Sequence, residues 1–185
     1  IDLATPTDAV PVAAPVEIPV DYVGWYVSLA VESDGNALTD DPLHIAAYDS
    51  GDGDLRYIHM TSYADASPQV VRVDANNSVG IYTSVLVRGG KPWISYYNNS
   101  ENGTRDSIKL ARYLGSMVTI ADGASSDGYA TGQWETLTVP VIPPPQGGLT
   151  KFLRVNLGFN TAGDPLLGYA ASSIEASRRL PEVTP

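Results

Sequence analysis

LHIAAYDSGDGDLRY, residues 43–57, is the stretch of sequence that decides the fold. It holds an apolar run that ends in Tyr-Asp, a turn made of Gly and Asp, and a second run in which apolar and polar residues alternate. Two strand-forming runs around such a turn predict a β-hairpin, because Gly adopts positive φ and Asp hydrogen-bonds to its own backbone. A hairpin that occurs once builds a small sheet, whereas one that recurs defines a repeat architecture.

The hairpin belongs to a unit that recurs three times. Each copy has a strand, a Gly turn, a second strand opened by Pro and ending near Tyr, a polar turn, and a third strand with alternating apolar residues. The copies are SLAVESDG, PLHIAAYD and DLRYIHM (28–60), SVLVRGG, PWISYYN and SIKLARY (84–113), and NLGFNTAG, PLLGYAA and SIEASRR (156–179). Their first residues, Ser28, Ser84 and Asn156, are 56 residues (84 − 28) and 72 residues (156 − 84) apart.

A further strand precedes each unit. These strands are VEIPVD (16–21), QVVRVD (69–74) and QWETLTVP (133–140). Four strands in roughly fifty residues match the size of a β-propeller blade. The pattern predicts an all-β chain with an extended Pro/Ala-rich arm (1–15) and a propeller unit (16–185), whose three four-stranded blades span 22–74, 79–140 and 152–180. The alternative is a β-sandwich or barrel, which also has short strands and Gly/Pro turns.

Composition narrows the range of partners. The 185 residues include no cysteine, which excludes disulfides, thiolate metal sites and a cysteine nucleophile. The net charge of −10 disfavours nucleic acid and anionic membranes as partners. No apolar run approaches about 18 residues, so we expect no membrane insertion. The chain begins at Ile1 rather than Met, which favours a processed protein that is secreted or displayed at the cell surface.

The order of motifs resembles the blades of sialidase-like propellers, and more closely the degenerate repeats of bacterial extracellular propellers. The residues that carry the resemblance are SLAV, a Gly turn, HIAAYD and DLRY. The resemblance implies that SLAV is an innermost strand and that the strand with VRVD is outermost. The sialidase Asp box has the wrong spacing in SSDGYATGQW (125–134) and no counterpart in the other blades, and sialidase catalysis needs residues from more blades than three. The resemblance therefore supports the fold and disfavours an enzyme.

Aromatic residues are expected to gather at one face of the propeller. Second strands end near Tyr48, Tyr96, Tyr97 and Tyr169, and first strands begin near Trp25 and Tyr82. Rings beside amides and carboxylates suit sugars or peptides, because rings stack at low entropy cost and polar groups orient the ligand. We predict a ligand-binding surface made of Trp25, Tyr48, Asp49, Tyr82, Tyr97, Asn98 and Asn99. The alternative is that the tyrosines pack between blades, a role that we assign to Trp93 and Trp134.

Other polar groups give weaker signals. Asp49, Asp52 and Asp54 could ligate Ca²⁺, the one cofactor considered, although Asp/Gly clusters are also ordinary turn chemistry. The two histidines, His44 and His59, each fall in a strand and lack metal-ligand spacing. No Gly-x-Ser-x-Gly elbow occurs, and no catalytic residue is predicted.

These patterns favour a non-enzymatic extracellular binding module that recognises a glycan or a surface protein at the propeller face. The alternatives are a structural subunit of an extracellular assembly, and a remnant or part of a sialidase-like glycoside hydrolase. Three blades cannot close a ring, because propellers typically have four to eight. We therefore expect either a homo-oligomer, as a six-bladed ring of two chains, or a companion chain that supplies the missing blades. In the ring, residues 16–21 of each chain would pair beside residues 173–179 of the other.

Overall fold

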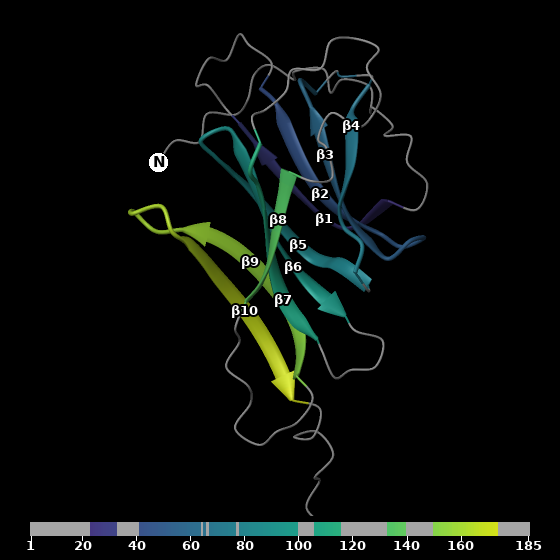
Figure 1. Ribbon diagram of the computed structural model, residues 1–185, viewed down its shortest axis with the longest axis vertical. Helices are drawn as coiled ribbons and strands as arrows, with labels where there is room; N and C mark the ends of the chain where they lie inside the picture. Colours follow the sequence, from purple (N-terminus) through teal and green to yellow (C-terminus); the bar gives the residue numbers. More distant parts are fainter. Residues whose placement is uncertain are drawn as a thin grey trace, which may run out of the picture.

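The computed structural model describes residues 23–32, 41–63, 65, 67–76, 78–99, 106–115, 133–139 and 150–173. The regular elements that these residues form are β-strands, with no α-helix among them, which confirms the predicted all-β class (Figure 1). None of these residues forms a helix of the length and apolarity that crossing a bilayer requires.

The strands form three antiparallel sheets, and every hydrogen-bonded pair joins strands that are consecutive in the chain. Sheet A has the order β1 (Val23–Val31), β2 (Leu43–Asp49), β3 (Asp54–Met60) and β4 (Gln69–Asp74). Sheet B has the order β5 (Ser78–Arg88), β6 (Lys91–Asn99), β7 (Ser107–Tyr113) and β8 (Trp134–Val139). Sheet C pairs β9 (Thr150–Phe159) with β10 (Pro165–Ser173).

The predicted order of strands is confirmed for the two four-stranded sheets. QVVRVD forms β4, at the edge of sheet A that is farthest in the pairing order from β1. The first strands start earlier than the repeat suggested, since β1 begins at Val23 and β5 at Ser78. The predicted arm (1–15), the strand at 16–21 and all but the first residue of the strand at 173–179 lie outside the described residues.

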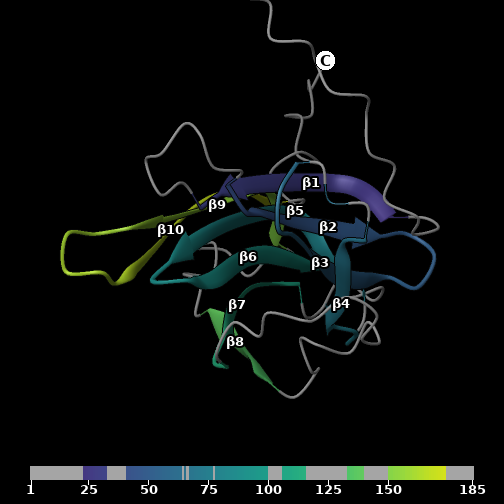
Figure 2. The ribbon, with the colours of Figure 1, turned by 90° about the horizontal axis from the view of Figure 1, so that it is seen from above.

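The core lies between successive sheets. Apolar side chains of sheet A, Ala46, Leu55, Tyr57, Val71 and Val73, form one buried cluster with Val79, Val85, Ile94, Tyr96, Ala111, Tyr113 and Trp134 of sheet B. A smaller cluster of Tyr97, Ile108 and Val155 joins sheet B to sheet C. The first strands β1, β5 and β9 are neighbours in that order (Figure 2).

Trp134 and Trp93 confirm the packing role predicted for them. The ring centroid of Trp134 lies 5.1 Å from that of Tyr57 and 5.4 Å from that of Tyr113. The ring of Trp93 lies edge-on to Phe159 of sheet C at 5.6 Å. Tyr96, at the end of β6, is fully buried in the same core as Trp134.

A buried ion pair ties sheet A to sheet B. The Oδ2 atom of Asp74, the last residue of β4, lies 2.7 Å from Lys109 Nζ and accepts a 2.7 Å hydrogen bond from the Tyr96 hydroxyl. The Asp74 side chain is only 2% exposed and that of Lys109 13%. Burial and the adjacent carboxylate raise the pKa of Tyr96, so its hydroxyl remains a protonated donor.

Candidate functional site

The first strands of sheets A and B carry the same backbone irregularity. Residues 23–31 (VGWYVSLAV) and 79–87 (VGIYTSVLV) share Val, Gly, Tyr, Ser and Val at matching positions. Tyr26 and Tyr82, which match in this alignment, both have positive φ, of 52° and 55°. The register with the next strand shifts at this point in each sheet. Such bulges turn side chains away from the regular strand direction, and positive φ at a non-Gly residue is concentrated at functional sites.

The two bulges bring five aromatic rings together. We call this set the aromatic group; its members are Trp25, Tyr26, Tyr48, Tyr82 and Tyr97. Tyr26 and Tyr82 form its centre, with ring centroids 4.7 Å apart in an edge-to-face arrangement. Tyr48 and Trp25 lie 6.2 Å and 6.4 Å from Tyr26, and Tyr97 lies 6.3 Å from Tyr82. The group therefore spans sheets A and B.

Four members of the aromatic group were singled out from the sequence, and Tyr26 was not. The signal that could have found Tyr26 is the shared V-G-x-Y-x-S pattern of residues 23–28 and 79–84. Trp25 and Tyr26 are exposed, whereas Tyr48 and Tyr82 are half-buried. Partial desolvation, together with the neighbouring Tyr82 hydroxyl, raises the pKa of Tyr26.

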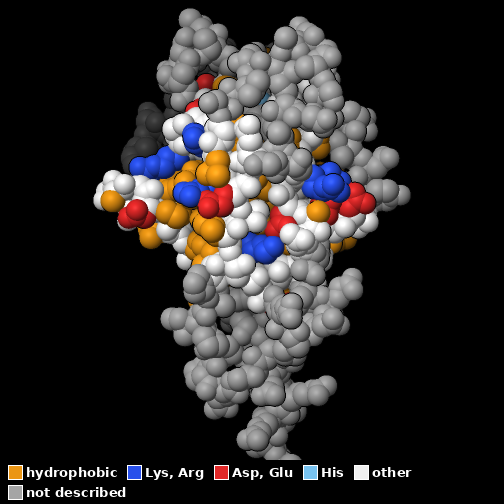
Figure 3. Space-filling model, in the orientation of Figure 1, with side chains coloured by type: hydrophobic (Ala, Val, Ile, Leu, Met, Phe, Trp, Pro, Cys, Tyr) orange, Lys and Arg blue, Asp and Glu red, His pale blue; other side chains and the backbone are white. Residues whose placement is uncertain are grey.

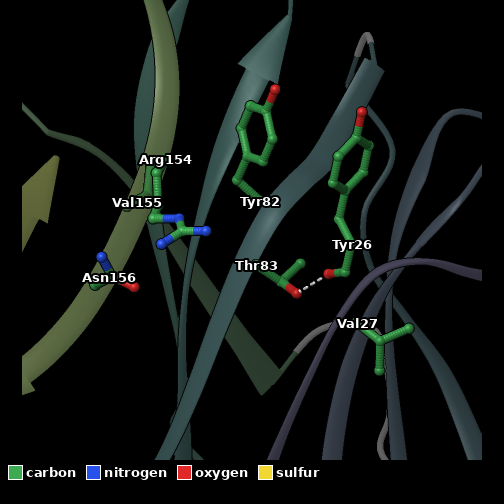
Figure 4. A pocket seen from close by; sticks show the side chains of 7 residues that line it. All are labelled: Tyr26, Val27, Tyr82, Thr83, Arg154, Val155 and Asn156. Carbon is green, nitrogen blue, oxygen red and sulfur yellow. Dashed lines mark hydrogen bonds between the residues drawn. The ribbon is translucent and has the colours of Figure 1, made fainter. Parts of the chain in front are cut away.

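The three first strands converge on a hollow next to the aromatic group. Its volume is about 180 Å³, and its walls are Tyr26, Val27, Tyr82, Thr83, Arg154, Val155 and Asn156 (Figure 4). The repeat spacing relates these residues, because Tyr82 follows Tyr26 by 56 positions (82 − 26) and Arg154 follows Tyr82 by 72 (154 − 82). Equivalent positions of the three units thus surround one hollow.

Arg154 is the only cation that the described residues place in the wall of the hollow. Its guanidinium extends from β9 towards β5 (Figure 4), and no acidic partner for it occurs among the described residues. Thr83, by contrast, is engaged within the fold: its hydroxyl donates to the backbone carbonyl of Tyr26 and accepts from the Ser28 hydroxyl at 3.1 Å. The Arg154 guanidinium is therefore the charged group in the wall that a ligand could contact.

Asp49, Asn98 and Tyr97 are buried, which corrects the expectation that they form an exposed surface. The Asp49 carboxylate accepts hydrogen bonds from Arg56 Nε and from the Gly51 amide, each at 2.9 Å. Burial opposes ionisation of Asp49, but these bonds outweigh it and keep the pKa of its carboxyl below the ordinary value.

Asn98 and Asn99 lie at the end of β6. Asn98 donates to the Ser107 hydroxyl at 3.3 Å, and Asn99 is half-buried. Tyr97 donates its hydroxyl to Asp106, and burial together with that carboxylate raises the pKa of Tyr97. These side chains support the strand ends, and the hollow is lined by other residues.

The three aspartates considered for Ca²⁺ surround a guanidinium. Arg56 Nη2 lies 2.8 Å from Asp49 Oδ2, 2.9 Å from Asp52 Oδ2 and 3.7 Å from Asp54 Oδ2. Arg56 thus supplies positive charge to all three carboxylates. The segment forms the tight turn between β2 and β3, closed by a 2.9 Å hydrogen bond from the Gly53 amide to the Asp49 carbonyl.

The two histidines pair across β2 and β3, in strands as predicted. The His44 and His59 ring centroids are 5.1 Å apart, and His44 Nδ1 lies 2.6 Å from the Tyr57 hydroxyl. Burial lowers the pKa of each to about 4, and the proximity of His44 adds to the effect on His59. Both rings are therefore neutral at physiological pH. No group of three or more metal-binding side chains is found in the described part of the chain.

No protein-family model, no curated protein and no solved structure matches this chain. Inference about function therefore depends on the geometry of the hollow and of the aromatic group.

Proposed function

We propose that the chain is a β-propeller unit that binds a ligand, without transforming it, at the hollow where β1, β5 and β9 meet. One observation carries the proposal: Tyr26, Tyr82 and Arg154 occupy equivalent positions of three units and surround the same hollow. In a propeller the blades are arranged radially, so equivalent residues of successive inner strands face a common central opening. The adjacency of β1, β5 and β9 supports that arrangement.

The chemistry of the hollow suits a glycan. The exposed Trp25 and Tyr26 rings offer apolar faces on which a sugar can stack, and rings of this kind lose little entropy on binding. Arg154 can donate several hydrogen bonds to hydroxyl or carboxylate oxygens. Concave sites with a few convergent polar groups among aromatic side chains are typical of small-ligand binding.

The residues around the hollow favour binding over catalysis. Among the described residues, its walls contain no carboxylate, histidine, serine or lysine, so they offer no pair of carboxyl groups that could act as acid and base. Glycoside hydrolysis generally needs two carboxyl groups on either side of the scissile bond. We place such a binding module outside the cell, where glycans are displayed.

A glycan array probed with the full-length chain tests this proposal. We expect binding to one class of glycan, weakened about tenfold, which corresponds to about 1.4 kcal/mol, by Tyr26→Ala and by Arg154→Gln. Tyr63→Ala is the matched control, because Tyr63 is an exposed tyrosine that does not line the hollow, and it should bind normally. An array without binding, or equal losses in all three variants, would contradict the proposal.

A further inference from the structure

The first strand of sheet A leaves an apolar face uncovered. Val27, Leu29 and Val31 alternate along β1 and so point to the same side of the sheet. Their side chains are 53%, 57% and 50% exposed. We call these three residues the β1 face. Regularly spaced large apolar side chains with this exposure are typical of an interaction surface.

Two of the three positions equivalent to the β1 face are buried in both of the other sheets, and the third, Val87 in β5 and Phe159 in β9, is half-buried. Thr83 and Val85 of β5 match Val27 and Leu29 at the 56-residue spacing, and they are only 9% and 3% exposed because sheet A covers them. The next equivalents, 72 residues further on in β9, are Val155 and Leu157, which are 2% and 9% exposed next to sheet B. Within the described residues, the β1 face is thus the member of the series that no sheet covers.

Sheet C carries residues equivalent to those with which sheet B covers its neighbour. Sheet B covers sheet C by placing Trp93 against Phe159 and by accepting a 3.1 Å hydrogen bond from the Leu157 amide at Ser84 Oγ. The equivalent of Ser84 in sheet C is Asn156, 72 residues further on (156 − 84). Strand pairing gives Leu166 as the equivalent of Trp93, because Trp93 pairs with Leu86 and Leu166 pairs with Gly158, which is 72 residues after Leu86 (158 − 86).

Both equivalents in sheet C are exposed, Leu166 by 53%. They lie on the same side of sheet C, because Leu166 pairs with Gly158, two residues after Asn156. We call this the sheet C face. Apolar side chains gather at the surface near β9 and β10 in the view of Figure 3.

We propose that the β1 face of one copy of this chain packs on the sheet C face of a second copy, with the contacts that the sheets already make within the chain. Leu166 of one copy would lie against Val31 of the other, as Trp93 lies against Phe159. The Asn156 side-chain oxygen would accept a hydrogen bond from the Leu29 amide of the other copy, as Ser84 Oγ accepts one from the Leu157 amide. Each copy has one face of each kind, so two such contacts related by a two-fold axis would close a head-to-tail dimer.

The dimer changes the candidate site. A hollow that lies between three first strands in one copy would be surrounded by six, and a second set of tyrosines and a second Arg154 would face the first. This inference rests on the propeller arrangement proposed above but not on the ligand. A failure to bind glycans would leave the dimer intact, and a failure to dimerise would leave a monomer that can still be tested on the array.

The mass of the full-length chain in solution, measured by light scattering after gel filtration, tests the dimer. We expect twice 19.6 kDa for the unchanged chain and a single-chain mass for Leu29→Asp and for Leu166→Asp. Both side chains are more than half exposed, so circular dichroism should show folded protein in each variant. Leu114→Asp is the control, because Leu114 is 51% exposed but belongs to neither face, and it should remain a dimer.

A mixture of the two disrupted variants separates head-to-tail packing from other dimers. The Leu29→Asp variant keeps an intact sheet C face and the Leu166→Asp variant keeps an intact β1 face, so mixing them restores one good contact per pair. We expect the mixture to contain a mixed dimer that neither variant forms alone. A monomeric unchanged chain, a dimer that survives either substitution, a mixture that stays monomeric, or open filaments in place of a closed dimer would each overturn the proposal.

Discussion

Replacing Lys109 by Met should leave the Asp74 carboxylate buried without its counter-ion. Breaking a buried ion pair by removing one partner typically costs 3–5 kcal/mol of folding free energy, because a charge stays desolvated. Here Asp74 keeps hydrogen bonds from the Tyr96 hydroxyl at 2.7 Å and from the Asn76 amide at 3.0 Å. We therefore expect a loss near the lower limit, about 3 kcal/mol.

Urea unfolding at pH 7 and fixed protein concentration measures this loss. With a denaturant slope of about 1–3 kcal/mol per molar, 3 kcal/mol moves the midpoint by about 1–3 M. Lys91→Met, which alters an exposed lysine on β6, should change stability by less than about 0.5 kcal/mol. The double variant Asp74→Asn/Lys109→Met should recover much of the loss, because neither charge remains. A cost below about 1 kcal/mol for Lys109→Met, or a double variant less stable than the single one, would refute this reasoning.

Two further predictions concern the core of sheet A and its contact with sheet B. Acidification should destabilise the fold, because the pKa of His44 and of His59 is about 4 in the folded chain and has its ordinary value of 6.5 in the unfolded chain. The contribution of the neutral histidines to stability is therefore complete above pH 6.5 and is lost as the pH falls towards 4. Thermal unfolding at pH 7.5 and pH 5 should differ by about 2 kcal/mol per histidine, and a His59→Gln variant with the same loss would contradict this origin. Gly80→Ala should lower the melting temperature clearly more than Gly24→Ala, because both glycines have positive φ but only the Gly80 Cβ would lie 3.0 Å from Leu55 Cα. Equal melting temperatures would mean that this close approach costs nothing.

The strand order of sheets A and B could be predicted because their strands obey period-2 alternation and begin or end at Pro, Gly and Asp. The early parts of β1 and β5 could not be predicted in this way, because the bulges at Tyr26 and Tyr82 interrupt the alternation of apolar and polar residues. Alternation of apolar and polar residues indicates a regular extended backbone, and a residue at positive φ interrupts that backbone. The repeated V-G-x-Y-x-S pattern held the information, but it becomes visible only when the two stretches are aligned.

The candidate site was predictable for its rings and not for its polar groups. Trp25, Tyr48 and Tyr82 follow from their places near the expected strand ends, although β5 begins at Ser78 and Tyr82 lies within it. Asp49, in contrast, was expected to be exposed and is buried. A carboxylate at a turn can fold inward when a partner is near, and its partner Arg56 lies seven residues away on the next strand. Arg154 escaped attention because it shares no chemistry with Tyr26 and Tyr82, although it occupies their position in the third unit.

The pairing of consecutive strands has a consequence for how the molecule opens. Each pair of strands can form before distant segments meet, because the strands that pair follow one another in the chain. The A–B cluster contains the buried Tyr57 and Tyr96 rings, whereas sheet C is attached through the smaller cluster around Val155. Partial unfolding should therefore begin at sheet C while sheets A and B stay paired. Backbone amides of β9 and β10 will then exchange with solvent deuterium well before those of β3 and β7.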